Sequence, residues 1–131
     1  MRSSSIAVCV AATIIAIAVA AQIPTPVAKT VELDAHGRDY LPVLSGSPET
    51  AGMRSGLVVL APQKSVGRHS TGEHEEILIV LEGKGQMIFG DSSTLPVEAN
   101  HAVYCPPRTV HDVRNTGQGT LRYVYVVAKV S

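Results

Sequence analysis

The segment from residue 66 to residue 85 gathers most of the side chains that could bind a metal ion. His69, His74 and Glu76 lie close together there, directly before the apolar run 77–81. Imidazole nitrogens and carboxylate oxygens are ligands of divalent transition metals, and a buried strand behind them would hold them in place. One more histidine, His111, lies in the segment 105–115. We expect the two segments to meet inside a small barrel.

The residues that must position these candidate ligands have the alternating pattern that predicts β-strands. In the stretch 75–82, Ile77, Ile79 and Leu81 alternate with Leu78 and Val80. A strand alternates its side chains between two faces, so apolar residues on both faces predict a central strand that is covered on both sides.

Further short strands are expected along the rest of the chain, separated by turns rich in glycine, proline and asparagine. They cover residues 57–61, 86–89, 94–99, 102–105, 110–115 and 121–130. This spacing predicts an all-β domain of antiparallel strands, either a sandwich or a closed barrel. We assign the barrel to residues 53–131 and an N-terminal arm with edge strands to residues 22–52.

Composition excludes several functions. The chain has 131 residues, which suits one domain, with 11 basic and 11 acidic side chains. It has no tryptophan and a single phenylalanine. A balanced charge gives no excess of positive charge to bind nucleic acid or an anionic membrane, and few aromatic residues are present to stack on bases. We expect no nucleic-acid partner.

The first 21 residues have the layout of a secretory signal peptide. Arg2 precedes an apolar run from residue 6 to residue 21, which ends in the small residues Ala18 and Ala20. This run is shorter than the roughly 20 residues that a membrane-spanning helix needs. We therefore expect cleavage, a secreted or periplasmic protein and no stable membrane anchor afterwards. Cys105 would then be the single cysteine, and a free cysteine is commonly buried.

The two ligand-bearing segments resemble the motifs of the cupin superfamily. The first motif reads G-x5-H-x-H-x3,4-E-x6-G and the second reads G-x5-P-x-G-x2-H-x3-N. In this chain the matching residues of both motifs, at matching spacings, are His69, Glu76, Gly83, Pro106, His111 and Asn115. The resemblance covers residues 57–128. It implies a jelly-roll β-barrel whose motif histidines and glutamate bind a divalent metal, and it also implies a homodimer that forms through an edge strand.

The chain departs from these motifs at the second histidine and at three glycines. Thr71 stands where the motif has its second histidine. Gln63, Asn100 and Arg108 stand at glycine positions, which weakens the prediction of turns there. Either Thr71 or the nearby His74 can fill the place of the second histidine. The predicted metal ligands are therefore His69, His74, Glu76 and His111.

Two histidines and one carboxylate suit Fe, Mn, Zn, Ni or Cu and leave coordination positions open. We expect a small molecule in the barrel. The first hypothesis is a metal-dependent enzyme, either a dioxygenase-like oxidoreductase or an isomerase. The alternative is a non-catalytic module that binds a small molecule without a functional metal centre. The sequence identifies no catalytic residue.

Overall fold

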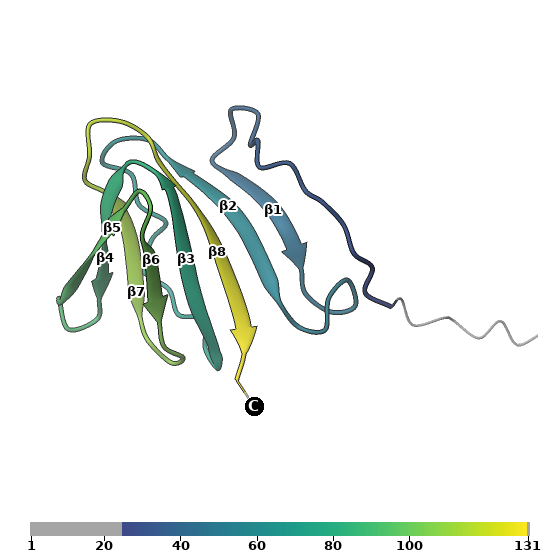
Figure 1. Ribbon diagram of the computed structural model, residues 1–131. Helices are drawn as coiled ribbons and strands as arrows, with labels where there is room; N and C mark the ends of the chain where they lie inside the picture. The colour runs from purple at the N-terminus through teal and green to yellow at the C-terminus, as the bar shows by residue number, and fades with distance from the viewer. Residues whose placement is uncertain (1–24, 131) are drawn as a thin grey trace, which may run out of the picture.

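The computed structural model describes residues 25–130, which form two antiparallel β-sheets packed face to face (Figure 1). The larger sheet has the strand order β1-β2-β8-β3-β6, and the smaller sheet has the order β5-β4-β7. The strands are β1 (Tyr40–Ser45), β2 (Arg54–Leu60), β3 (His74–Glu82), β4 (Lys84–Phe89), β5 (Thr94–Glu98), β6 (Ala102–Cys105), β7 (His111–Asn115) and β8 (Leu121–Lys129). This architecture confirms the predicted all-β class.

Some of the sequence predictions concern parts that this architecture does not test. The signal peptide at residues 1–21 lies outside the described residues, and the boundary between residues 52 and 53 stays a prediction. β1 belongs to the stretch before that boundary and occupies one edge of the larger sheet. Within residues 25–130, no helix is long and apolar enough to cross a membrane.

Alternating apolar side chains from both sheets fill the space between them. On β3 the inward residues Leu78 and Val80 are almost fully buried, and on β8 Leu121 and Tyr123 are buried in the same way. The core cluster comprises Val58, Leu60, Leu78, Val80, Met87, Val97, Val103, Cys105, Val113, Leu121 and Tyr123. These side chains come from strands of both sheets, so their burial holds the sheets together and stabilises the barrel wall that carries the site.

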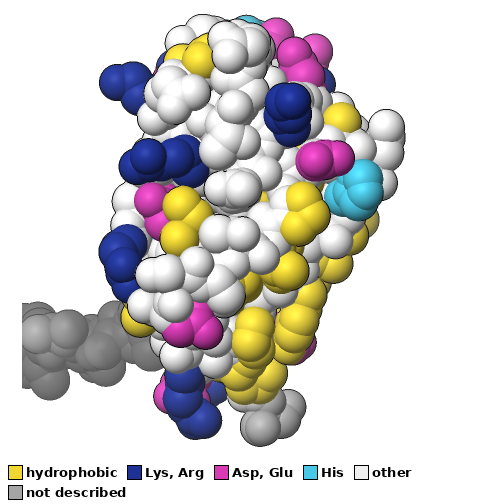
Figure 2. Space-filling view, turned by 90° about the vertical axis from the view of Figure 1, so that its left-hand side faces the viewer, with side chains coloured by type: hydrophobic (Ala, Val, Ile, Leu, Met, Phe, Trp, Pro, Cys, Tyr) yellow, Lys and Arg dark blue, Asp and Glu magenta, His cyan; other side chains and the backbone are white. Residues whose placement is uncertain are grey.

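The prediction that β3 is covered on both faces is wrong for its outer face. β3 is central within its sheet, between β8 and β6, but Ile77, Ile79 and Leu81 are 37–41% exposed. Tyr104 lies opposite Ile77 on β6 and is 52% exposed. Figure 2 shows hydrophobic side chains gathered in a band on one side of the molecule. No second layer of the described chain packs on these outer residues, although their pattern is that of a buried strand.

The three missing motif glycines have not removed the turns that they would have formed. Gln63, Asn100 and Arg108 all have positive φ angles, of 67°, 67° and 57°. This left-handed conformation suits glycine, is tolerated by asparagine and is strained for other residues. The motif's backbone is therefore retained at all three positions, and the core and the sheet hydrogen bonds hold it there.

We expect Gln63→Gly to stabilise the protein by about 0.5–1 kcal/mol, because the strain of a left-handed glutamine exceeds the added flexibility of glycine. The Gln63 side chain is exposed, so little contact is lost. Urea unfolding measures the change. Gln86→Gly is the matched control, since Gln86 is exposed but lies within β4, where glycine should destabilise. A Gln63→Gly variant as unstable as the control would contradict the prediction.

Candidate metal centre

His69 is held beside His111 by a short backbone pairing outside the regular strands. The His69 N–H donates to the His111 carbonyl, and the His111 N–H donates to the His69 carbonyl, each at 2.9 Å. Further along, the Val66 N–H donates to the Val113 carbonyl at 3.1 Å. The chain before β3 thus runs along the free edge of β7, and this brings the two imidazole rings to a centroid distance of 4.4 Å.

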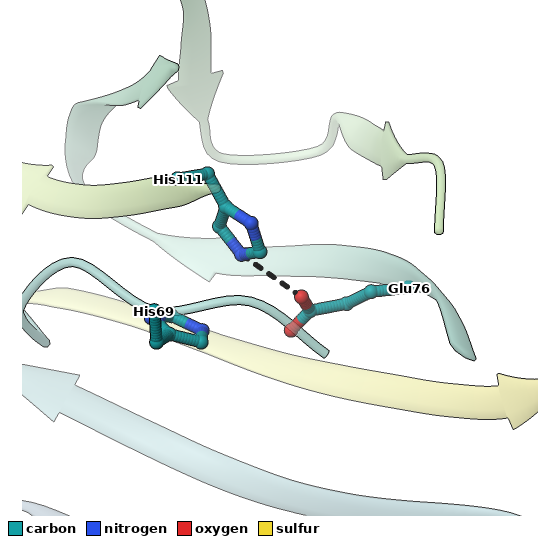
Figure 3. Close-up of side chains that lie close together, drawn as sticks. All are labelled: His69, Glu76 and His111. Atoms are coloured by element: carbon teal, nitrogen blue, oxygen red, sulfur yellow. Dashed lines mark ion pairs between the residues drawn. The ribbon is translucent and has the colours of Figure 1, made fainter. Parts of the chain in front are cut away.

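Glu76 reaches the same point from the opposite sheet. It lies on the inner face of β3 and is only 6% exposed, whereas His111 at the start of β7 is 1% exposed. Glu76 Oε2 lies 3.0 Å from His111 Nε2, as the dashed line in Figure 3 marks. The ligand atoms of His69, Glu76 and His111 all lie within 4.8 Å of one another. Residues far apart in sequence therefore converge between the two sheets.

Backbone carbonyls orient both imidazole rings. His69 Nδ1 lies 2.8 Å from the Gly67 carbonyl oxygen, and His111 Nδ1 lies 3.1 Å from the Thr109 carbonyl oxygen. A carbonyl oxygen only accepts, so in each neutral ring the proton sits on Nδ1 and the lone pair remains on Nε2. This arrangement favours the tautomer that a metal-binding histidine needs.

The surroundings of His111 change the acid–base properties of two groups. Burial lowers the pKa of His111, but Glu76, the Thr109 carbonyl and Asp112 outweigh that effect and hold the pKa above its ordinary value. Cys105 Sγ lies 3.3 Å from His111 Nδ1, and burial together with the Glu76 charge raises the pKa of this thiol to about 11. Cys105 is therefore a buried thiol at neutral pH and provides no thiolate ligand or nucleophile.

Two buried polar atoms indicate that this group fits a metal ion. Among the described residues, Glu76 Oε2 and His111 Nε2 are the buried side-chain atoms without a hydrogen-bond partner. A buried polar atom without a partner costs free energy, so such atoms need an explanation. Both atoms face the same point, and imidazole with carboxylate is a donor set that divalent transition metals accept. A bound cation would satisfy both.

The structure does not bring His74 into this group. His74 begins β3, and its Nδ1 lies 3.1 Å from the Thr71 carbonyl oxygen. The Thr71 hydroxyl donates to the His74 carbonyl at 2.7 Å. These contacts close the turn before β3 and occupy both residues with each other. The ligand role of His74 therefore stays a prediction without support from its position. Thr71 lines the same cavity as His69 and Glu76, and its place as the second ligand also stays a prediction.

Asp112 is a residue of the site that the sequence did not reveal. Its Oδ1 accepts a hydrogen bond from the Gly67 N–H at 3.0 Å, and Gly67 in turn binds His69 through its carbonyl. Asp112 is only 9% exposed. It thus holds the loop that carries His69. Its position directly after His111 could have suggested a role near the site, but its hydrogen-bond partner Gly67 is far away in the sequence.

A cavity of about 420 Å³ opens beside the group of His69, Glu76 and His111. His69 and Glu76 lie in its wall. The other lining residues are apolar, hydroxyl-bearing or cationic, namely Tyr40, Arg54, Val58, Val66, Ser70, Thr71, Val113, Tyr123, Tyr125 and Val127. This volume is within the range of small-molecule sites, which are mostly apolar with a few placed polar groups.

An antiparallel two-sheet barrel with histidine and glutamate ligands converging inside it is the arrangement of the cupin fold. The sequence profile of the cupin domain matches residues 56–127, which is more than half of the chain. The protein belongs to the cupin family. This confirms the resemblance seen in the two motifs. A comparison with curated proteins found no match.

Solved structures show the same fold. The chain is similar to a Cupin 2 conserved barrel domain protein from Salinispora arenicola, with 25% identity over 77% of this chain and 82% of that one, at a TM-score of 0.60. It is also similar to an RmlC-like cupin family protein from Methanocaldococcus jannaschii, with 16% identity over 78% and 91% of the two chains, at a TM-score of 0.63. That protein has a double-stranded β-helix fold. These similarities confirm the jelly-roll barrel.

Proposed function

We propose that this protein is an exported cupin that holds a divalent metal ion with His69, Glu76 and His111 and acts on a small molecule in the adjoining cavity. The observation that carries the proposal is that the buried atoms Glu76 Oε2 and His111 Nε2 face each other at 3.0 Å and that neither has a hydrogen-bond partner outside this pair. A metal ion would supply Lewis-acid or redox chemistry there.

The residues of the chain would divide the work between binding and orientation. His69, at the exposed side of the group, and the two buried ligands leave open the side that faces the cavity. Three protein ligands with an open position are typical of catalytic rather than structural metal sites. The valines of the cavity wall would exclude water from the ligand and hold its apolar part. Dioxygenase-like oxidation and isomerisation are both compatible with this arrangement.

A non-catalytic binding module is the second candidate. It is favoured by Thr71, which stands at the second-histidine position and whose hydroxyl is already bonded to the His74 carbonyl. A site with one ligand fewer than the motif would hold its metal more weakly. In that case the cavity would capture the small molecule without turning it over.

Elemental mass spectrometry of the protein, purified without a histidine tag, tests the proposal. We expect about one equivalent of Fe, Mn, Zn, Ni or Cu per chain, either as purified or after reloading. Absence of every one of these metals after reloading would reject the metal site and favour the second candidate. A stoichiometric metal with no turnover of any substrate would favour a metal-loaded binding module.

Metal affinity should fall as the pH is lowered from about 8 to about 5. A histidine must lose its proton to bind a metal, and the apo protein holds the proton of His111 more tightly than a free imidazole does. Proton competition should therefore begin above pH 6.5, the ordinary histidine value, and cost up to about tenfold in affinity per pH unit for each histidine ligand. Competition with a chromophoric chelator across this range measures it. An affinity that is constant down to pH 5 would contradict histidine ligation.

We also propose that the protein is a homodimer. The support is the exposed apolar face formed by Ile77, Ile79 and Tyr104 near the edge strand β6. Exposed contiguous apolar patches mark contact surfaces in soluble proteins. Light scattering after size exclusion measures the mass in solution, and a monomer at all concentrations would reject this part of the proposal.

Export rests on the layout of residues 1–21. We propose cleavage after Ala20 or Ala21 and a secreted or periplasmic location. The mass of the protein recovered from the exported fraction tests this, because an uncleaved chain would retain the apolar run.

A further inference from the structure

The larger sheet brings an arginine to the wall of the cavity, two strands away from Glu76 in the same row of paired residues. Arg54 begins β2, lines the cavity together with His69 and Glu76, and is exposed. Its register partner on β8 is Val127, whose side chain also lines the cavity. Among the residues that the structure describes, no carboxylate forms an ion pair with Arg54, and no hydrogen bond engages its guanidinium. The other charged residue of the cavity wall is Glu76.

The position of the Arg54 side chain is defined by its packing. Gly46 leaves room for the Arg54 stem, since a Cβ at that position would lie 3.0 Å from Arg54 Cγ. The Arg54 charge also acts on Tyr125 and opposes the rise of its pKa. The Arg54 stem therefore lies against Gly46, and its charge is close enough to influence Tyr125, which lines the same cavity.

Two tyrosines add hydrogen-bond donors beside this arginine. The Tyr40 and Tyr125 rings are stacked at a centroid distance of 6.4 Å, and their hydroxyl oxygens lie 2.9 Å apart. One hydroxyl donates to the other, so the hydrogen of the accepting hydroxyl is free to donate to something else. Burial and the bond to Tyr40 raise the pKa of Tyr125, so this hydroxyl keeps its proton at neutral pH.

Gly56 is needed for the stacked pair. A Cβ on Gly56 would lie 2.5 Å from the Tyr40 ring and 2.8 Å from the Tyr125 ring. Glycine allows both rings to lie against β2, where both tyrosines line the same cavity as Arg54. The cavity wall therefore contains the hydrogen-bond donors of Arg54, Tyr40 and Tyr125 together with several valines.

We propose that Arg54, assisted by the Tyr40–Tyr125 pair, binds the carboxylate of a small organic acid. The apolar body of this acid lies along the valines of the cavity wall, toward His69, Glu76 and His111. This inference rests on the proposed function, because it names the ligand class of the same cavity. The planar guanidinium matches a carboxylate with two parallel hydrogen bonds. A monoanion fits better than a phosphate, since the described wall offers one cation and a second negative charge would stay unpaired.

Matched acid and amide probes test the inference. Calorimetry compares 4-methylpentanoate with 4-methylpentanamide, which have the same shape and differ in charge, on metal-free protein so that a metal cannot bind the carboxylate. We expect wild type to bind the acid about ten- to a hundredfold more tightly than the amide. Arg54→Met should remove this preference. Arg54→Lys should keep only part of it, because the lysine ammonium cannot form the two parallel hydrogen bonds of a guanidinium.

Arg108→Met is the matched control. Arg108 is paired with Glu73 and lines a different depression, so this variant should keep the wild-type preference. No preference for the acid in wild type, or the same preference in Arg54→Met, would overturn the inference. Metal content is measured on the same variants. A wild-type protein that takes up metal but shows no preference for the acid rejects only this inference. A wild-type protein that prefers the acid but takes up no metal rejects only the proposed metal site.

Discussion

Replacing His111 with alanine is expected to weaken metal binding by more than about a hundredfold. Loss of a residue that merely orients a ligand costs about 10–100-fold in affinity, and His111 would itself be a ligand. The remaining His69 and Glu76 would form a two-ligand site, and the Glu76 carboxylate would lose the imidazole that lies 3.0 Å from it. Elemental mass spectrometry after dialysis and a chelator titration measure the stoichiometry and the affinity.

His101→Ala is the matched control for this change. His101 Nδ1 lies 3.1 Å from the carbonyl oxygen of the residue two before it, the same contact that His111 makes. His101 is exposed, however, and lies outside the group of His69, Glu76 and His111. The control should keep full metal content. Because His111 is buried, Glu76→Gln provides a second variant that keeps the side-chain shape and removes the charge. A folded Glu76→Gln protein with unchanged affinity would reject the site.

Replacing Asn115 with alanine should cost about 3–5 kcal/mol of folding free energy. The Asn115 amide donates to the carbonyls of Leu60 and Gly119, each at 2.8 Å, and its oxygen accepts from the Gly117 N–H at 2.9 Å. Asn115 is fully buried, so alanine would remove the donor to the Leu60 and Gly119 carbonyls, at a cost of about 1–3 kcal/mol each. The Gly117 N–H would keep its bond to the Lys84 carbonyl at 3.2 Å. Urea unfolding should show a lower midpoint with an unchanged slope.

The neighbouring Thr116 provides a surface control, because it is exposed and Thr116→Ala should stay within about 0.5 kcal/mol of wild type. Asn115→Asp keeps the accepting oxygen but aims a carboxylate at two carbonyl oxygens. Those neighbours would raise the pKa of the new carboxyl in the folded state, so this variant should gain stability as the pH falls through that pKa. An Asn115→Ala protein within about 1 kcal/mol of wild type would show that water replaces the lost bonds.

Much of the fold follows from local patterns in the sequence. Alternating apolar residues define the strands, because side chains alternate between the faces of a sheet. The motif spacing to Gly83 also singles out Glu76 rather than Glu75, and the structure places Glu76 on the inward face of β3. This much requires no knowledge of how the strands pair.

Only the tertiary structure decided what surrounds the site. The place of His69 depends on its pairing with β7, and Asp112 holds that loop through Gly67 across the chain. The unpartnered Arg54 enters the cavity because its register opposite Val127 turns it inward. Such contacts join residues far apart in sequence, so no local pattern predicts them.

The left-handed residues show the same division. The amino-acid sequence determined a β-barrel and predicted histidine and glutamate as its metal ligands, but it lacks glycine at three motif turns, which weakened the prediction of those turns. The folded chain keeps Gln63, Asn100 and Arg108 left-handed all the same. The reason is physical: burying the core gains far more free energy than the about 1–2 kcal/mol that each strained residue costs.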